Sequence, residues 1–364
     1  MAGAIAGLLG VGTVMVYSAS AVRASAAAGE TDAYLVRHLI SIALGLIGMG
    51  AALRVPVERW SRFAYALLAL STVLLVLVHV PGLGHRVNGA QRWLQLGPIG
   101  FQPAELTKLA VVVYLAHSLA KKRDKVATFS VGFLPHVLVT GGLVLLILVQ
   151  PDLGTSVIIF ATLGLMMFVA GTRIGYLVLA ALMALPVAYH YVSSRPHAWK
   201  RLLVFLEPEA HKAGIGYQVW ESLVSVGSGG LFGVGLGEGR QKLYFLPESH
   251  TDFVFAIIGE ELGFIGIVLV IGLFAVLIGR ALRLATRASV RFAMFLGFGI
   301  AAWLGSQAVL NMMVVMALVP TKGLTLPLVS FGGTSMIVTL VALGILLRLS
   351  AEEESFTGAA RGAG

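Results

Sequence analysis

The sequence predicts an all-α, polytopic membrane protein with ten transmembrane helices and both termini in the cytoplasm. Of its 364 residues, 58% are hydrophobic and only 12% are charged, and the mean hydropathy is +0.91. A water-soluble domain needs a larger polar surface than this composition supplies, so a bilayer must solvate most of the chain. Apolar stretches of about 20 residues, the length that crosses a bilayer, follow one another almost end to end.

Ten apolar stretches are candidate spans. They lie roughly at residues 2–22, 34–53, 63–81, 103–120, 130–149, 154–171, 174–192, 252–279, 291–319 and 334–350. The connection 193–251, between the seventh and eighth spans, is the large outer loop. We expect the polar tail 351–364 to be short, cytoplasmic and disordered, which leaves residues 1–350 as a single transmembrane domain.

The distribution of Lys and Arg predicts the orientation of these spans. The connections on the side of the two termini are rich in basic residues. The short connections on the opposite side carry only Arg23, Arg86, Arg92 and Lys322. Basic loops stay in the cytoplasm, so the Gly- and Pro-rich segments between the spans are expected to face outward. The net charge of +9 is then explained by cytoplasmic loops that face anionic lipid and by an anionic substrate, and it does not indicate binding to nucleic acid.

The first outer segment leads into a span that is expected to begin at Pro103, since a proline costs no hydrogen bond in a first helical turn. Glu105 and Lys108 are three residues apart and can pair on one helical face. The pair either fixes this helix in the bundle or lines a polar cavity, where Lys108 could meet phosphate. Arg92 and Trp93 fit an interfacial anchor at least as well as a sugar contact.

The next two outer segments have structural interpretations as well. Asp152, which follows Gln150 and Pro151, is either the N-cap of the following span or a functional acid at the outer face. The alternating glycines of residues 227–239 do not match a nucleotide-binding loop, because the GxGxxG spacing fails and no Gly-Lys-Ser/Thr follows. We expect tight turns on the membrane surface there, with a shallow interfacial helix around Trp220.

Asp252 begins the eighth predicted span. The polar run before it contains Glu248, His250 and Thr251. The Asp252 carboxylate is either an anion stabilised by the helix N-terminus or a half-buried base, whose pKa is raised enough to accept a hydroxyl proton. Glu260 and Glu261 would lie two turns deeper, so they should meet cations or water inside the bundle.

Residues 320–335 contain two prolines and three glycines, which excludes a regular helix. Irregular backbone near membrane depth is tolerated only where it lines a cavity or is covered by protein. Lys322 and exposed N–H groups would bind an anion there. The alternative is a capped turn that leads through Ser330 into the last span. Cysteine is absent and the nine histidines lack metal-site spacing, so a structural zinc site is not expected.

These outer segments, in this order on ten spans, resemble the SEDS family of shape, elongation, division and sporulation proteins. The resemblance covers nearly the whole chain. It is carried by Arg92–Trp93 with Gln102 to Lys108, by Gln150 to Gly154, by Thr251–Asp252–Phe253 with Glu260, Glu261 and Gly263, and by Lys322 to Pro327 with Ser330 to Gly333. Within the family, the short cytoplasmic tails and the overall pattern resemble the elongation members more than the division members.

The resemblance implies an inverting peptidoglycan glycosyltransferase of the bacterial inner membrane. It would act on lipid II and polyprenyl-linked glycan at the outer leaflet, in cell elongation and shape maintenance. Expected partners are a class B penicillin-binding protein, which is the transpeptidase, and other membrane proteins of the elongation complex. No organic cofactor is expected, and a divalent cation, magnesium or manganese, is left open.

Asp252 matches the essential acid of the family and is the expected general base. The candidate substrate-binding residues are Arg92, Trp93, Glu105, Lys108, Asp152, Arg201, Glu248, His250, Thr251, Lys322 and Ser330. Two other functions fit the same outer segments, a lipid II flippase and a non-catalytic scaffold of the wall-synthesis machinery. The cytoplasmic loops lack a polar motif for loading and no inverted repeat is evident, which weighs against transport.

Overall fold

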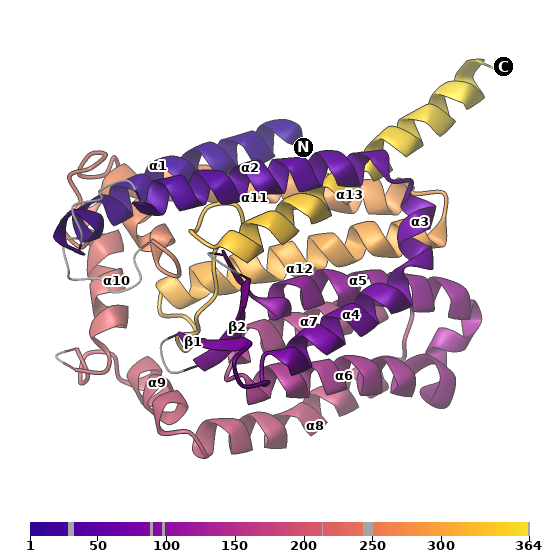
Figure 1. Cartoon of the computed structure of the whole chain (residues 1–364), viewed down its shortest axis with the longest axis horizontal. Coiled ribbons are helices and arrows are strands. Elements are labelled where there is room, and N and C mark those ends of the chain that lie inside the picture. The colour runs from indigo at the N-terminus through magenta and orange to yellow at the C-terminus, as the bar shows by residue number, and fades with distance from the viewer. Residues whose placement is uncertain (28–32, 88–89, 97–98, 213, 243–249, 363–364) are drawn as a thin grey trace.

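Most of the chain is a bundle of long helices that run along one axis (Figure 1). The computed structural model describes residues 1–27, 33–87, 90–96, 99–212, 214–242 and 250–362. The long helices are α1 (Ala2–Ala27), α2 (Ala33–Arg54), α4 (Ala64–Leu77), α5 (Pro103–Lys122), α6 (Leu134–Val149), α7 (Leu153–Val169), α8 (Ile174–Ser193), α11 (Val254–Arg287), α12 (Arg291–Val315) and α13 (Gly333–Gly362). A short helix, α3 (Val57–Arg62), joins α2 to α4.

Each of the ten predicted spans coincides with one of these long helices. Within the described residues, seven helices are long and apolar enough to cross a membrane, namely α1, α2, α6 with the turn before it, α8, α11, α12 and α13. The apolar helices α4 and α7 are shorter, with 14 and 17 residues, and α5 carries Glu105 and Lys108 among its apolar residues. A multi-pass membrane protein is therefore supported, while the count of ten spans and the cytoplasmic termini stay predictions.

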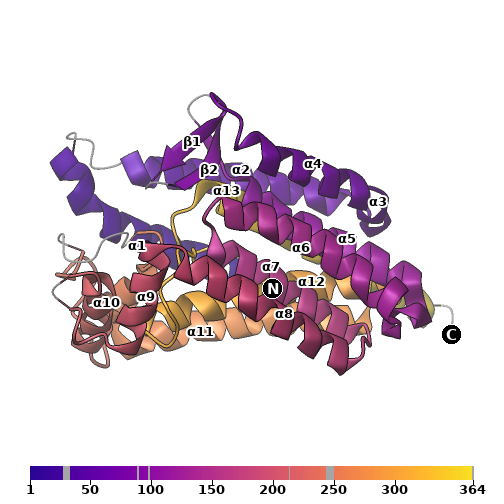
Figure 2. The same ribbon diagram turned by 90° about the horizontal axis from the view of Figure 1, so that it is seen from below.

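The core of the bundle is centred on α12, which packs against α5, α7, α11 and α13. Figure 2 shows α2 and α4 along one side of the bundle and α11 along the opposite side. At the periphery, α8 has no buried residue, as expected for a helix that faces lipid. Trp303 of α12 is among the largest fully buried side chains, so the interior of the bundle is filled by side chains around this helix.

A small antiparallel sheet corrects the all-α prediction. Its strands β1 (Gly84–Val87), β2 (Ala90–Leu96) and β3 (Ile99–Phe101) pair in the order β1-β2-β3. Strands this short carry a weak sequence pattern and need packing partners to be stable. Here Gln91 donates to the Val78 carbonyl at 2.7 Å, and this contact ties β2 to the end of the preceding helix.

The predicted outer loop 193–251 contains two further helices, α9 (Pro196–Leu206) and α10 (Tyr217–Ser228). Figure 1 shows both at one end of the bundle, where they run across the ends of the long helices. The expected helix around Trp220 is confirmed by α10. Because α9 and α10 lie across the bundle rather than along it, they form its end face.

The tail 351–364, predicted to be disordered, is helical as far as Gly362 in α13. Ala and Glu are strong helix formers and simply extend the preceding span. Arg348 pairs with Glu352 one turn later at 2.6 Å, and the Glu352 carboxylate also accepts from the Val57 backbone N–H at 3.3 Å. These contacts fasten the first turn of the extension to α3.

A break at Gly263 divides α11 into two parts. Gly263 has φ 66° and ψ −162°, a conformation that side chains disfavour. Residues 254–261 before the break are all buried, whereas Phe264 and Ile265 after it are exposed. The part after Gly263 is long enough to span a bilayer by itself. Glu260 and Glu261 therefore lie in the short buried part of α11, just before the break, and not in the longer part that can span a bilayer.

Candidate functional site

Asp252 lies in the turn that precedes α11. The N-cap residue of α11 is Phe253, so Asp252 lies one residue before the cap. Both interpretations of its carboxylate stay predictions. A Cβ atom added to Gly323 would lie 3.2 Å from Asp252 Oδ2. The irregular segment 318–332 thus passes directly beside this half-buried carboxylate, and the missing side chain of Gly323 allows the approach.

One face of α12 holds Asp252 and this segment together. Gln307 and Asn311 are four residues apart and therefore share a helical face. Asn311 Nδ2 donates to the Asp252 carbonyl at 2.9 Å and to the Leu324 carbonyl at 2.5 Å. Gln307 Nε2 donates to the Thr325 carbonyl at 2.9 Å. The segment is irregular, as predicted, and its backbone is bonded to a helix side chain at successive residues.

Glu105 and Lys108 form the predicted pair, with Lys108 Nζ 2.9 Å from Glu105 Oε2. Lys108 is only 2% exposed. Its ammonium also donates to Gln307 Oε1 at 2.7 Å and lies 5.3 Å from the centre of the Trp303 ring. The pair thus fixes α5 against the polar face of α12, which is the structural one of the two interpretations. A direct contact of Lys108 with substrate stays a prediction.

Asp152 is the N-cap of α7, the structural one of its two interpretations. Its carboxylate accepts from Thr155 N at 3.0 Å and from Gln102 Nε2 at 3.3 Å. Arg92, on β2, donates through Nε to the Gln150 carbonyl at 3.0 Å and through its terminal nitrogen to the Pro151 carbonyl. Arg92 and Asp152 therefore meet at the turn between α6 and α7.

Trp93 is half-buried and packs over Gly100 of β3, where a Cβ atom would lie 3.3 Å from its ring. The sequence left an interfacial anchor and a sugar contact open for this tryptophan. Packing against the neighbouring strand gives it a structural role in the sheet. The structure does not test a contact with sugar.

His250 and Ser330 both shape the segment beside Asp252. The Ser330 hydroxyl accepts from Leu326 N at 2.8 Å and closes a turn. The His250 carbonyl accepts from Phe331 N at 3.0 Å, and the His250 ring packs edge-on against Tyr34 with ring centres 4.9 Å apart. These contacts join three parts of the chain into one cluster: the residues before α11, the start of α2 and the irregular segment.

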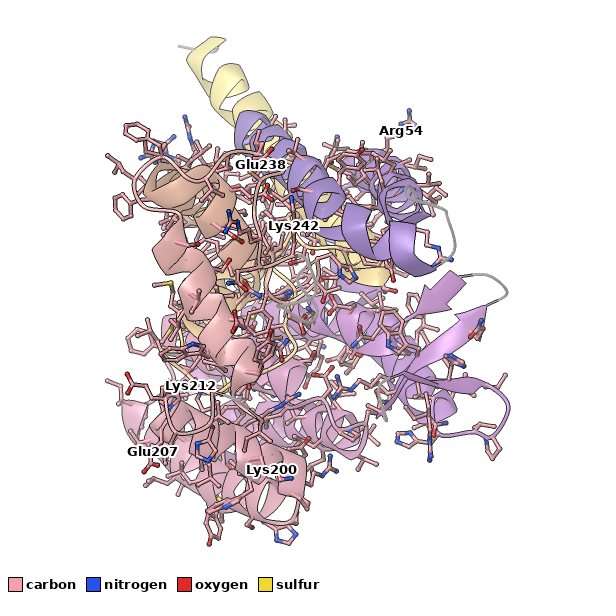
Figure 3. The ribbon with its side chains drawn as sticks, turned by 90° about the vertical axis from the view of Figure 1, so that its left-hand side faces the viewer. Arg54, Lys200, Glu207, Lys212, Glu238 and Lys242 are labelled. Carbon is pink, nitrogen blue, oxygen red and sulfur yellow. The ribbon has the colours of Figure 1, made fainter. Side chains whose placement is uncertain are left out.

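Among the remaining predicted site residues, Lys322, Thr251 and Arg201 differ in position and burial. Lys322 is half-buried on the irregular segment, and this burial lowers the pKa of its ammonium group. Thr251 is half-buried beside Asp252. Arg201 is instead exposed on α9, the helix that carries Lys200 at the lower edge of the end face in Figure 3. Glu248 lies outside the described residues.

Glu261 meets a cation, as the sequence predicts, whereas Glu260 accepts hydrogen bonds from backbone N–H groups and a serine hydroxyl. Lys242 Nζ lies 2.7 Å from Glu261 Oε1, and Ser18 of α1 donates to the same carboxylate at 2.7 Å. Glu260 Oε1 accepts from the backbone N–H of Arg240 at 2.7 Å. The sequence did not identify Lys242 or Ser18 as these partners, because both lie far from the two acids along the chain.

Sequence reasoning also missed Gln307 and Asn311. The available signal was two amides, one helical turn apart, inside an otherwise apolar span. Polar residues at membrane depth usually face the interior of the bundle and carry a structural or functional role. The two amides therefore mark the face of α12 that holds the segment beside Asp252.

The described residues contain no group of three His, Asp or Glu side chains arranged to hold a metal ion. Magnesium is commonly held by one or two carboxylates together with the phosphates of a substrate and water. Asp252 beside a phosphate-bearing substrate would fit that mode of binding. A magnesium site made only of protein ligands does not fit the described residues.

Comparisons with known proteins find relatives along nearly the whole chain. The family model FTSW_RODA_SPOVE, described as a cell cycle protein, matches residues 1–355. The probable peptidoglycan glycosyltransferase FtsW of Trichlorobacter lovleyi is 44% identical over 347 residues, which cover 95% of this chain and 91% of that protein. Stage V sporulation protein E of Bacillus subtilis is 40% identical and covers 94% of both chains.

Solved structures share the fold. The crystal structure of the Thermus thermophilus rod shape determining protein RodA aligns with a TM-score of 0.71 and 31% identity, and the alignment covers 96% of this chain and 95% of that one. A chain from a peptidoglycan synthase complex, in a structure concerned with the coordination of polymerization and crosslinking, aligns with a TM-score of 0.79 and 31% identity over 96% of both chains.

Proposed function

The chain belongs to the FtsW/RodA/SpoVE family of cell cycle proteins, the SEDS family, and we propose that it polymerises glycan strands from lipid II at the outer face of the membrane. It is a peptidoglycan glycosyltransferase of this family. In the proposed reaction, the growing lipid-linked glycan is transferred onto lipid II, and undecaprenyl pyrophosphate is released. The substrates are accordingly lipid II and the polyprenyl-linked glycan.

Asp252 is the general base in this proposal. It takes the proton from the 4-hydroxyl of the acceptor GlcNAc, and that oxygen attacks C1 of the terminal MurNAc of the donor. The bond between C1 and the pyrophosphate oxygen breaks, and its electron pair leaves with undecaprenyl pyrophosphate. Because the donor is α-linked and the product β-linked, one displacement inverts the anomeric carbon.

The observation that carries this proposal is the close approach of Gly323 to Asp252 Oδ2. It brings the carboxylate next to the segment that contains Lys322, so the proposed base lies beside the backbone of the residue that follows a cation. Negative charge that develops on the leaving pyrophosphate would be stabilised by a nearby cation. Lys322 is the candidate cation with the best support. Lys108 is bonded to Glu105 and Gln307, and Arg201 is exposed.

The remaining candidate residues have narrower proposed roles. Arg92, Asp152 and Ser330 hold the backbone around the site, as their hydrogen bonds indicate. His250 and Thr251 flank the approach to Asp252 and are the better candidates for contact with sugar. A divalent cation, magnesium or manganese, would enter with the pyrophosphate of the substrate and help to neutralise its charge.

The cellular role of the enzyme is the second part of the proposal, and it is either division or elongation. Relatives named FtsW are 42–44% identical to the chain, whereas the RodA structure is 31% identical. FtsW is the division member of the family and RodA the elongation member. The higher identity favours a role in division, which we propose, over the role in elongation and shape maintenance that the sequence analysis predicts.

Rescue of depleted cells would separate the two roles. The chain should restore septation to a rod-shaped bacterium depleted of its division member, and should not restore rod shape after depletion of the elongation member. Rescue of rod shape alone would support elongation. A class B penicillin-binding protein is the proposed partner in either case, which the similarity to a chain of a peptidoglycan synthase complex supports.

The proposed chemistry is tested by incubating purified protein and its penicillin-binding partner with labelled lipid II. We expect glycan polymer from the native chain and a rate about 10²–10⁴-fold lower from Asp252→Asn, the usual effect of losing a placed base. Glu238→Gln, at an exposed acid on the end face in Figure 3, is the matched control and should polymerise normally.

Three other outcomes would contradict the proposal. Normal polymer from a well-folded Asp252→Asn protein would refute the assigned base. Movement of lipid II across liposomes without polymer would identify a flippase. Neither activity, in a preparation that binds its partner, would identify a scaffold.

A further inference from the structure

A nine-residue loop between α10 and α11 exposes large apolar side chains. The loop comprises residues 229–237, Gly-Gly-Leu-Phe-Gly-Val-Gly-Leu-Gly, and carries no charge. Phe232 is 76% exposed, and Leu231, Val234 and Leu236 are exposed as well. We call these residues the apolar loop. A concentration of exposed apolar groups in so short a segment marks a surface that contacts something other than water.

The backbone of the apolar loop is bonded to α11. Val234 N donates to the Glu260 carbonyl at 2.9 Å and Gly235 N to the Glu261 carbonyl at 3.2 Å. In the other direction, Phe264 N donates to the Gly230 carbonyl at 2.9 Å. The loop therefore occupies the place where Gly263 interrupts the hydrogen bonds of α11, and protein groups satisfy these backbone donors and acceptors.

The glycines allow this close packing. A Cβ atom on Gly233 would lie 2.1 Å from the Glu261 carbonyl oxygen, and one on Gly229 would lie 1.9 Å from the Gly259 carbonyl oxygen. Gly233 also has φ 81°, where a side chain would be strained. The loop thus lies flat on the break in α11, with its backbone inward and its apolar side chains outward.

The side chains of the apolar loop continue the exposed apolar face of α11. Phe264 and Ile265, the first residues after the break, are both half or more exposed, as are Val268 and Leu269 one turn further along. This part of α11 is a candidate membrane span. The surface formed by the loop is therefore continuous with a surface that faces the bilayer.

We propose that the apolar loop inserts into the outer leaflet and that its partner is the hydrocarbon of the bilayer. Non-helical backbone is tolerated in hydrocarbon only where its polar groups are satisfied by protein, and the bonds to α11 satisfy the N–H groups of Val234 and Gly235 and the carbonyls of Gly230 and Leu231. In water, four exposed apolar side chains on an uncharged loop would be unfavourable, because apolar surface is hydrated at a cost in free energy. Charge returns immediately after the loop, at Glu238 and Arg240, which places the polar boundary there.

The insertion would set the height of the site in the membrane. The loop holds Glu260 and Glu261 through their carbonyls, and Lys242 and Ser18 bind the Glu261 carboxylate. The buried residues 254–261 run from these acids back toward Asp252. An anchored loop would therefore keep Asp252 at a constant depth relative to the pyrophosphate of a membrane-bound substrate.

Collision of dissolved reagents with a spin label tests this insertion directly. The chain has no cysteine, so a single Phe232→Cys substitution can carry one nitroxide. The labelled protein is placed in liposomes of phosphatidylethanolamine and phosphatidylglycerol, without any partner. Oxygen concentrates in hydrocarbon, whereas a polar nickel chelate stays in water, so the ratio of their relaxation effects reports the surroundings of the label.

Two matched positions calibrate the ratio. Val268→Cys, on the exposed face of α11, is the hydrocarbon reference, and Ala210→Cys, exposed between α9 and α10, is the aqueous reference. We expect the ratio at position 232 to match that at 268 and to exceed that at 210 several-fold. Leu236→Cys should behave in the same way and serves as a second position if the label at 232 disturbs folding.

Two results would overturn the proposal. A ratio like that at position 210 would place the loop in water. A label that neither reagent reaches would show that protein covers the loop.

Discussion

Asn311 donates from Nδ2 to the backbone carbonyl of Asp252 at 2.9 Å, across 59 positions of the chain. The same nitrogen donates to the Leu324 carbonyl at 2.5 Å. An amide group has two N–H donors, and both are used here. Asn311 therefore sets the distance between the proposed base and the segment that carries Lys322.

The first prediction concerns Asn311 as a positioning residue. Asn311→Leu should lower kcat for polymerisation by about 10²-fold, the typical cost of a displacement of roughly 1 Å in an active site, and should change KM for lipid II little. Ser222→Ala is the matched control, because Ser222 donates to the Val315 carbonyl at the end of the same helix. A native kcat for Asn311→Leu would show that Asp252 is positioned without it.

The second prediction concerns the buried pair of Glu105 and Lys108. Removal of one partner leaves a buried charge uncompensated, so Glu105→Gln or Lys108→Met alone should lower the free energy of unfolding by about 3–5 kcal/mol. The double variant should regain much of this loss. Unfolding in nanodiscs measures both effects, and strictly additive losses would show that the two side chains do not interact.

The more exposed pair of Arg348 and Glu352 provides the control for that experiment. Its side chains are 33% and 22% exposed, so water screens the interaction. Arg348→Met should therefore cost less than about 1 kcal/mol. A loss as large as that for Lys108→Met would mean that charge burial does not explain the difference.

The third prediction concerns the pH dependence that Lys322 confers. Its lowered pKa means that the ammonium loses its proton at a lower pH than an ordinary lysine. If this cation stabilises the leaving pyrophosphate, activity should fall as the pH rises through that lowered pKa. Lys322→Arg keeps its charge at high pH and should move this decline to higher pH. An unchanged alkaline limb in Lys322→Arg would remove Lys322 from the mechanism.

The stability of the folded state should change with pH in the direction opposite to the activity. Between the lowered pKa of the folded state and the ordinary lysine pKa, the unfolded chain binds more protons, so the folded state gains stability as the pH rises. Melting temperature and activity should therefore diverge over the same pH range. A parallel decline of both would indicate that the activity loss is unfolding.

The fourth prediction concerns the divalent cation. If the ion enters with the substrate pyrophosphate, a chelator should reduce polymerisation, and magnesium or manganese should restore it. The melting temperature of the substrate-free protein should stay unchanged, since the described residues offer no three-ligand site. A chelator that lowers this melting temperature would reveal an ion bound by the protein itself, and unaffected polymerisation would exclude a role for the ion.

Local sequence properties were sufficient for the helices. The length of an apolar stretch and the identity of its boundary residues act within one segment, so the ten stretches coincide with helices and α5 begins at Pro103 as expected. Asp152 caps α7 for the same reason. The helix around Trp220 was also predictable, since its apolar residues recur on one face.

Elements that depend on distant parts of the chain were missed. The three short strands are stable only against the helices on which they pack. The break at Gly263 exists because the apolar loop bonds to α11 there. Gly263 belongs to the motif that contains Glu260 and Glu261, but the sequence alone does not show that the helix is interrupted there.

The sequence by itself determined that this chain is a membrane protein and which residues form its helices. It also singled out Asp252 among the carboxylates. Hydropathy and short motifs are properties of neighbouring residues, so they can be read from one segment at a time. Only the tertiary structure decided what surrounds that carboxylate. Asn311, Gly323 and the break in α11 act on Asp252 or on its helix through contacts between residues far apart in the chain. Such contacts form when the bundle packs, so no single segment could reveal them.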